Sequence, residues 1–167
     1  NGYETTKTGF SLGTGYEQYE DIYFSPSIST YVEDLTTSSG ASDTLKKQSG
    51  NYFESKVSYS FDLDKRNQRF QTSDGHRLIF SQGVPLYSEE YSFSNAIVTE
   101  KWYEFNNGMV TNIGFYGKMI NSLNGEDVRL TDRLSLPKAR LKGFNTSKVG
   151  PVDNGDYVGG NYVSSIN

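Results

Sequence analysis

The feature that most constrains the fold is an alternation of apolar and polar residues along the segment 52–63, which reads YFESKVSYSFDL. Successive side chains of a β-strand point to opposite faces, so a period of two predicts a strand with one apolar and one polar face. The apolar positions are Val57, Tyr59, Phe61 and Leu63, and the polar positions between them are Lys56, Ser58, Ser60 and Asp62. We expect a curved antiparallel sheet that carries this apolar row on its convex side.

Other parts of the chain show the same preference for strands, with less regular alternation. The further strands are predicted at residues 9–17, 22–32, 76–86, 91–105 and 110–120. The chain has 13 Tyr and 17 Gly but only 4 Pro, a composition that favours strands and turns over helices. The connections are expected to be turns at 18–21, 64–75 and 106–108, and a long polar loop at 33–51. The fold class predicted is all-β, an antiparallel meander.

The predicted strands are longer than the roughly 5 to 6 residues of a typical strand, and crossing a bilayer takes about 9 to 11. In a transmembrane β-barrel one face of each strand meets lipid and the other a polar interior, which fits a mean hydropathy of −0.64. An aromatic girdle at one membrane interface is expected from Tyr16, Tyr19, Tyr23, Trp102, Tyr103 and Phe105. A soluble β-sandwich or open sheet explains the periodicity equally well.

Several functions have no support in the sequence. There is no cysteine, the net charge is −4, and His76 is the only histidine. A negative chain lacks the electrostatic footprint of a nucleic-acid-binding protein, and one histidine beside Ser73 and Asp74 cannot form a triad, because triad side chains converge from separate positions. The acidic stretch 153–156 is too short for an EF-hand. We therefore expect no enzyme activity, no metal and no cofactor.

The segment 139–162, ARLKGFNTSKVGPVDNGDYVGGNY, is glycine-rich and should be a long loop. RLKGF followed by GPVDNGDYVGGN resembles the sixth extracellular loop of the BamA-like outer-membrane protein assembly factors, within the wider BamA/TamA superfamily. Residues 121–136 resemble the lead-in to that loop, 64–78 an inter-strand turn of the family, and 2–17 one of its barrel strands. Gln71 stands where the family usually has proline.

The resemblance implies an outer-membrane β-barrel assembly factor, located in the bacterial outer membrane, that folds and inserts β-barrel proteins without ATP or cofactor. Its partners would be nascent outer-membrane β-barrel proteins, outer-membrane lipids and accessory assembly lipoproteins. Residues 1–167 would be a fragment of about seven barrel strands, the last truncated, without the POTRA domains and the remaining strands. Short turns would be periplasmic and long loops extracellular, and the loop at 139–162 would fold into the barrel.

The resemblance also implies the site residues. The loop-anchor motif comprises Arg140, Leu141, Lys142, Gly143 and Phe144, and the loop turn comprises Gly150, Pro151, Asp153, Asp156, Gly159, Gly160 and Asn161. Lys142 stands where the family has an arginine that reaches into the barrel lumen. We expect it to anchor the loop by pairing with carboxylates beyond Asn167, and Arg140 is the alternative anchor.

Other functions stay open at this point. A TamA-like factor or a two-partner-secretion translocation barrel of the same superfamily would carry a similar barrel. A barrel fused to a patatin-like phospholipase would need an upstream Gly-x-Ser-x-Gly. An unrelated soluble β-sheet module would bind ligands through its aromatic residues. The basic turn with Lys65, Arg66 and Arg69 is expected to be hydrated, and contact with phospholipid headgroups is the alternative.

Overall fold

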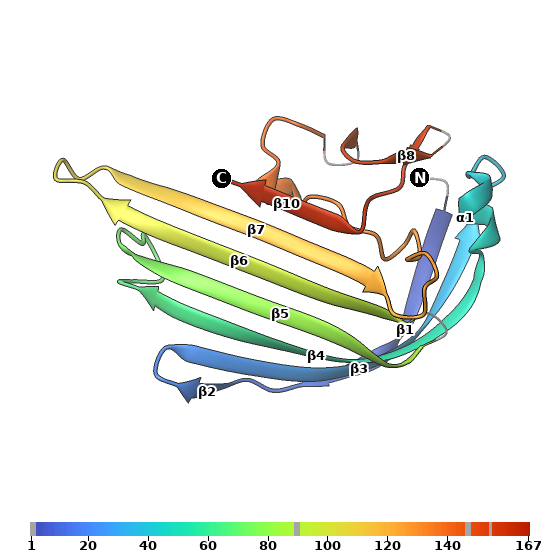
Figure 1. The fold of residues 1–167 in the computed structure, drawn as a ribbon, viewed down its shortest axis with the longest axis horizontal. Helices are drawn as coiled ribbons and strands as arrows, with labels where there is room; N and C mark the ends of the chain where they lie inside the picture. The colour runs from blue at the N-terminus through green and yellow to red at the C-terminus, as the bar shows by residue number, and fades with distance from the viewer. Residues whose placement is uncertain (1–2, 89–90, 146–147, 154) are drawn as a thin grey trace.

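The computed structural model describes residues 3–88, 91–145, 148–153 and 155–167, apart from the side chains of Thr44 and Asp156. Its main sheet has the order β1-β3-β4-β5-β6-β7-β10, and each neighbouring pair is antiparallel (Figure 1). The strands are β1 (Tyr3–Gly13), β2 (Tyr16–Tyr19), β3 (Ile22–Thr37), β4 (Gly50–Arg66), β5 (Gly75–Ser88), β6 (Ser92–Glu104), β7 (Val110–Ser122) and β10 (Tyr162–Ile166). The predicted all-β meander is confirmed.

The remaining elements are small and lie at one end or along one face of the sheet. They are α1 (Asp43–Lys47), the 3-10 turn η1 (Lys138–Arg140) and the hairpin formed by β8 (Val152–Asp153) and β9 (Asp156–Tyr157). None of the helices in the described ranges is long and apolar enough to cross a membrane.

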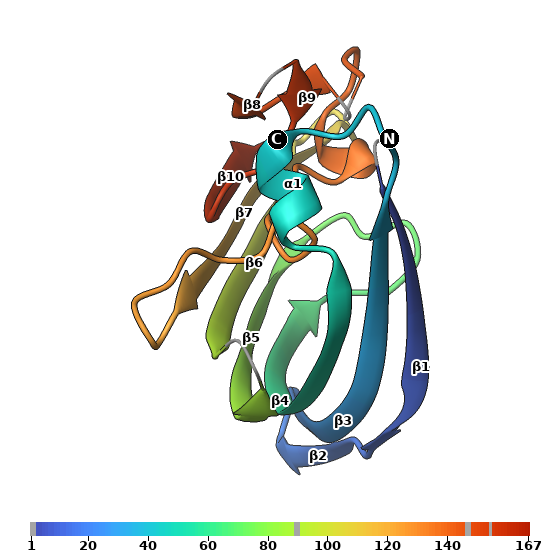
Figure 2. The same ribbon diagram turned by 90° about the vertical axis from the view of Figure 1, so that its right-hand side faces the viewer.

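The sheet curves into a trough, and α1 and the chain after β7 lie on its concave side (Figure 2). Strand register places Phe24, Phe61 and Phe80 side by side on the convex face. The ring centroids of Phe24 and Phe61 are 4.8 Å apart, and Phe61 is still 40% exposed. The apolar row of 52–63 therefore lies on the convex face, as its alternation predicts, and the polar positions between face the trough.

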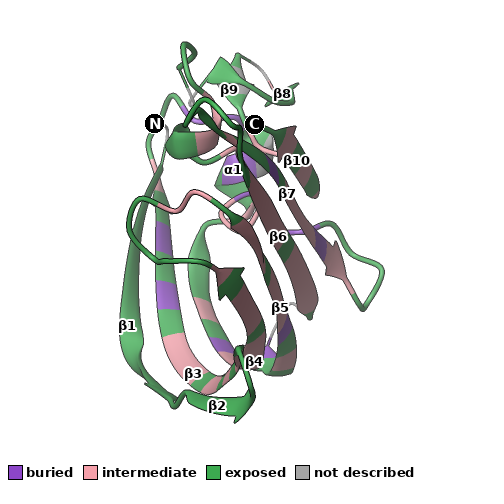
Figure 3. Ribbon diagram, turned by 90° about the vertical axis from the view of Figure 1, so that its left-hand side faces the viewer, coloured by how far each residue is buried: buried purple, intermediate pink, exposed green. Residues whose placement is uncertain are grey.

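The predicted loop at 33–51 is wrong over its first and last residues. β3 continues to Thr37 and β4 begins at Gly50, so the connection is 38–49 and contains α1. Glu33 and Leu35 are each only 1% exposed, and Glu33 contacts Arg129; Figure 3 shows buried bands along β3. The polar residues of this stretch suggest a surface loop. Glu33 is nevertheless buried, because it lies against the basic side chains of Lys7 and Arg129 from elsewhere in the chain.

Pro26 explains an interruption beside β3. The predicted strand at 9–17 is two strands, since β1 ends with Gly13 opposite Ser27 and β2 begins with Tyr16 opposite Phe24. Proline has no backbone N–H, so the ladder breaks opposite it. The Pro26 carbonyl still accepts a 3.1 Å hydrogen bond from the Thr14 N–H.

The predicted aromatic girdle is divided between the two faces. Tyr16 packs edge-on against Phe24 on the convex face, with centroids 5.8 Å apart. Trp102 instead lies on the trough side, where the Arg66 guanidinium stacks 5.6 Å from its ring, and Tyr23 shares that side through its register with Asp62. Placing Tyr23 and Trp102 in a lipid-facing girdle is therefore wrong, because strand parity turns them inward.

Candidate functional site

The chain between β7 and β10 returns over the trough before rejoining the sheet (Figures 1 and 2). We call residues 123–161 the inward segment. It leaves from the end of β7 and comes back to pair with the same strand through β10. The Ile120 N–H donates to the Asn161 carbonyl at 2.9 Å, so the two ends of the segment meet. Its path places basic side chains against the polar concave face of the main sheet. We call the strands of this sheet the wall.

Arg129 is the most buried charged residue of the inward segment, at 1% exposure. Its guanidinium lies 3.5 Å from Glu33 Oε2 and 3.3 Å from Glu54 Oε2, and Nη2 lies 2.9 Å from Asp132 Oδ2. The same group sits 4.5 Å from the centroid of the Tyr52 ring. One arginine thus joins β3, β4 and the inward segment.

The wall carboxylates that meet Arg129 also have other partners. Lys7 Nζ lies 3.3 Å from Glu33 Oε2, and Lys56 Nζ lies 3.0 Å from Glu54 Oε1. The Tyr31 hydroxyl donates a 2.6 Å hydrogen bond to Glu54 Oε2. A charge buried in the trough is tolerated when it is paired and hydrogen-bonded. Glu54 meets both conditions, whereas Glu33 is paired with Lys7 and Arg129 but its carboxylate oxygens have no hydrogen-bond partner among the described residues.

A small apolar core supports the cluster from the side of α1. Ala41, Leu45 and Leu130 pack together, and Val158 adds to them. The Gln48 side chain accepts a 2.9 Å hydrogen bond from the Leu130 N–H. Because Val128 and Leu130 flank Arg129 and are both buried, the backbone is held where the guanidinium can reach both wall strands.

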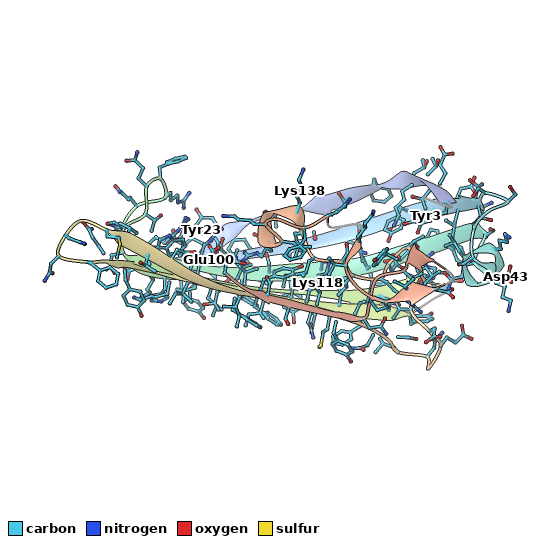
Figure 4. The ribbon with its side chains drawn as sticks, turned by 90° about the horizontal axis from the view of Figure 1, so that it is seen from above. Tyr3, Tyr23, Asp43, Glu100, Lys118 and Lys138 are labelled. Atoms are coloured by element: carbon cyan, nitrogen blue, oxygen red, sulfur yellow. The ribbon has the colours of Figure 1, made fainter. Side chains whose placement is uncertain are left out.

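Arg140 makes a second contact between the inward segment and the wall. Its Nη2 lies 3.5 Å from Glu100 Oε1 on β6, and its guanidinium lies 5.3 Å from the Tyr116 ring centroid on β7. Figure 4 views the trough from above and labels Glu100 and Lys138, the latter at the start of η1. A Cβ built on Gly114 would lie 3.6 Å from Arg140 Nη1, an ordinary van der Waals distance, so Gly114 lies directly beside the guanidinium.

The wall around Glu100 is itself charged and paired. Register places Arg77 opposite Glu100, and Arg77 Nη2 lies 2.6 Å from Asp62 Oδ2. Arg66 makes the equivalent 2.6 Å contact with Asp64. The trough surface is therefore a network of opposite charges that extends from the wall to the inward segment.

The structure does not bring Lys142 to a carboxylate. Lys142 is exposed, and no ion pair is recorded for it in the described part of the chain. Leu141 is half-buried, Gly143 has a φ of 83°, and Phe144 is 70% exposed. The anchoring contact observed is that of Arg140, and its partner Glu100 precedes the loop instead of lying beyond Asn167. Lys142 as an anchor stays a prediction.

The predicted turn residues lie at the end of the inward segment. Gly159 has a φ of 70°, and a Cβ there would lie 2.9 Å from the Leu134 carbonyl oxygen. Gly160 forms a β-bridge with Leu134, and the Pro151 carbonyl accepts from the Val158 N–H at 3.0 Å. Gly150 has a φ of 122°, and Asp153 pairs in register with Asp156. The Asp156 side chain lies outside the described atoms.

Arg129 was not among the predicted site residues, although the family-like stretch 121–136 contains it. The signal available was an arginine between two aliphatic residues, Val128 and Leu130, which is unusual for a solvated loop. Of its wall partners, Glu33 fell in the predicted loop 33–51, and Glu54 was visible only as an acidic residue of the predicted strand 52–63. No group of three or more potential metal ligands occurs among the residues that the structure describes.

Comparison with known proteins gives one positive result. A family model described as the Omp85 superfamily domain matches residues 1–165. A search of curated proteins found no significant match.

Proposed function

The chain belongs to the Omp85 superfamily, and from that premise we propose that its protein folds and inserts β-barrel proteins into the bacterial outer membrane. Proteins of this superfamily are outer-membrane proteins of Gram-negative bacteria. The long antiparallel strands with an apolar convex face and a polar concave face support a place in the wall of a membrane barrel. In this proposal residues 1–167 contribute wall and inward segment.

The observation that carries the proposal is the attachment of the inward segment to the wall by Arg129 and Arg140. Arg129 bridges to β3 and β4, and Arg140 to β6. Irregular backbone at membrane depth is tolerated when it is buried in protein or lines a wet cavity. A segment tied to separate wall strands holds their relative positions. In the proposal, this keeps the shape of the barrel wall while substrate strands pair at an exposed strand edge elsewhere in the barrel.

The chemistry required is strand pairing. A nascent strand adds to an exposed strand edge through main-chain hydrogen bonds, as in other cases of β-augmentation. No bond is made or broken, so the proposal needs no catalytic residue, metal or cofactor. The proposed partners are nascent outer-membrane β-barrel proteins, the lipids around the barrel and accessory assembly lipoproteins.

A translocation barrel of the same superfamily is the competing function, and the inward segment bears on the choice. A polypeptide that passes through the lumen needs that space, and the segment occupies the trough through buried ionic contacts. Clearing it would break the contacts of Arg129 with two buried carboxylates. The contacts therefore favour insertion over translocation.

The test uses the natural full-length protein reconstituted in phospholipid vesicles. A urea-unfolded outer-membrane β-barrel protein is added, and its folding is followed by heat-modifiable gel migration and protease protection. We expect faster folding than in empty vesicles. Transport of an unfolded chain into the vesicle lumen without faster barrel folding would reject insertion in favour of translocation.

A further inference from the structure

We propose that Lys65, His76 and Lys101 form a binding site for the phosphate group of an anionic phospholipid. The site lies on the convex face, at the end of the sheet with the shorter connections. Short turns of outer-membrane barrels are periplasmic, so the lipid belongs to the periplasmic leaflet. This inference rests on the membrane placement in the proposed function.

The three residues are direct cross-strand neighbours. Lys65 on β4 is opposite His76 on β5, and His76 is opposite Lys101 on β6. Lys65 and Lys101 lie near the ends of β4 and β6, and His76 near the start of β5; these strand ends meet on the left-hand side of Figure 1. Side chains directly opposite each other in an antiparallel pair are about 4.5–5.5 Å apart at Cβ. A single phosphate group can therefore reach all three.

Lys65, His76 and Lys101 form a row on the convex face, the convex row, with little negative charge around it. Lys65 Nζ lies 3.9 Å from Asp21 Oδ2, with the two side chains 52% and 45% exposed. Lys101 Nζ sits 5.0 Å from the Tyr103 ring centroid, and within the described ranges no ion pair is recorded for His76 or Lys101. Lys65 and Lys101 flank His76 from the two neighbouring strands, so an anion at this row would be attracted by both ammonium groups.

The inner face at the same level gives an internal comparison. Arg66 and Arg77 follow Lys65 and His76 in the chain and point to the trough, where each pairs with an aspartate at 2.6 Å. Arg66 and Arg77 are thus each paired with a wall carboxylate at short range, whereas in the convex row only Lys65 has a carboxylate in range, Asp21 at 3.9 Å. The difference indicates that the partner of the convex row comes from outside the protein.

The surroundings of the row select a lipid over a free phosphate ion. The next row of convex side chains towards the centre of the sheet, two residues along each strand, is Leu63, Leu78 and Thr99. The row after that is Phe61, Phe80 and Ile97. Ile113, opposite Lys101 on β7, is 56% exposed. A phospholipid presents a phosphate at the level of the basic row and acyl chains along the apolar rows, so its two parts match both surfaces.

The experiment measures lipid preference directly. The full-length protein is reconstituted in phosphatidylcholine bilayers, and the association of spin-labelled phosphatidylglycerol and phosphatidylcholine with its surface is compared by electron paramagnetic resonance. The double variant Lys65→Gln/Lys101→Gln should reduce the preference for phosphatidylglycerol by about 25-fold, because each ammonium group near the surface adds about 1 kcal/mol of attraction, or about fivefold. The variant Lys65→Arg/Lys101→Arg should retain the preference.

The matched control is Lys47→Gln, an exposed lysine of α1 at the other end of the sheet, which should leave the preference unchanged. A preference that persists in the double Gln variant, or that falls equally in the control, would overturn the site. Displacement of the labelled lipid by inorganic phosphate as effectively as by phosphatidylglycerol would overturn its assignment to a lipid.

The proposed insertion function is assayed separately in phosphatidylcholine vesicles. Loss of insertion with intact lipid preference rejects only the function, and the reverse result rejects only the lipid site. If the protein does not enter a phosphatidylcholine bilayer at all, both the lipid site and the insertion function are rejected.

Discussion

Arg129 Nη2 lies 3.3 Å from Glu54 Oε2, although 75 residues separate the two in the chain. The contact ties the inward segment to a central strand of the wall, and its surroundings exclude water, since Arg129 is 1% and Glu54 8% exposed. Removing Arg129 takes away the cation shared by Glu33 and Glu54 and leaves each buried carboxylate with one lysine, Lys7 or Lys56.

We expect Arg129→Met to destabilise the protein by about 3–5 kcal/mol, since it leaves Glu33 and Glu54 buried without their arginine. The measurement is the free energy of unfolding in detergent, together with protease cleavage within 123–161. The control is Arg69→Met, because the Arg69 side chain is 75% exposed, and it should change stability by less than about 0.5 kcal/mol. Equal stability of the two variants would show that the Arg129 cluster does not hold the segment.

Two tyrosine hydroxyls in the same region donate to acceptors of different charge. Tyr31 donates to the Glu54 carboxylate at 2.6 Å, and Tyr52 donates to the Gln48 carbonyl at 2.7 Å. Hydrogen bonds to charged groups contribute about 1.5–3 kcal/mol and neutral ones about 0.5–1.5. Tyr31→Phe should therefore lower the free energy of unfolding more than Tyr52→Phe, and the opposite order in urea titrations would contradict the Tyr31–Glu54 bond.

Arg140 and Lys142 are the two candidate anchors of the loop tip. We expect Arg140→Ala to increase proteolysis between residues 141 and 150 more than Lys142→Ala, because Arg140 contacts both Glu100 and Tyr116. Limited proteolysis of the full-length protein, followed by mass spectrometry of the fragments, makes the comparison. Greater cleavage in Lys142→Ala would instead assign the anchor to Lys142, as the family resemblance implies.

Gly9 on β1 has no room for a side chain. A Cβ at this position would overlap the Thr30 carbonyl oxygen and lie 2.5 Å from Tyr31 Cα, both backbone atoms of β3. Gly9→Ala should lower stability by about 1–3 kcal/mol and expose β1 to protease. Gly40→Ala is the control, since a Cβ there meets nothing within 4 Å. If both variants unfold at the same urea concentration, the close approach of β1 to β3 is not a constraint.

The strands were largely predictable because their signal is local. Alternation along 52–63 identifies both the strand and its apolar face, and the turn at Asn106–Gly108 sets the boundary between the last two long strands. The interruption between β1 and β2 was missed, although Pro26, which lies opposite it on β3, has no N–H to donate. Prediction failed at 33–37, where the partners that bury Glu33 come from distant segments, and for Tyr23 and Trp102, whose strand parity turns them towards the trough.

The candidate site was predictable only in part. The glycine-rich turn at Gly159 and Gly160 follows from the residue types, since a φ of 70° at Gly159 suits glycine. The pairing of Arg140 with Glu100 joins residues from different elements, and the choice between Arg140 and Lys142 depends on how η1 presents its side chains. The positions of Arg140 and Lys142 in the sequence do not show which of them contacts a wall carboxylate.

By itself, the sequence determined the all-β class, most strand positions and the apolar convex face, because periodicity and backbone chemistry act over neighbouring residues. Only the tertiary structure decided that Glu33, Glu54 and Arg129 would be buried together. Each is an ordinary polar residue in its own segment, and it is the curvature of the sheet and the return of the inward segment that bring them into one water-poor space. Burial of a charge is favourable only with its partners in place, so that part of the design exists only in the folded chain.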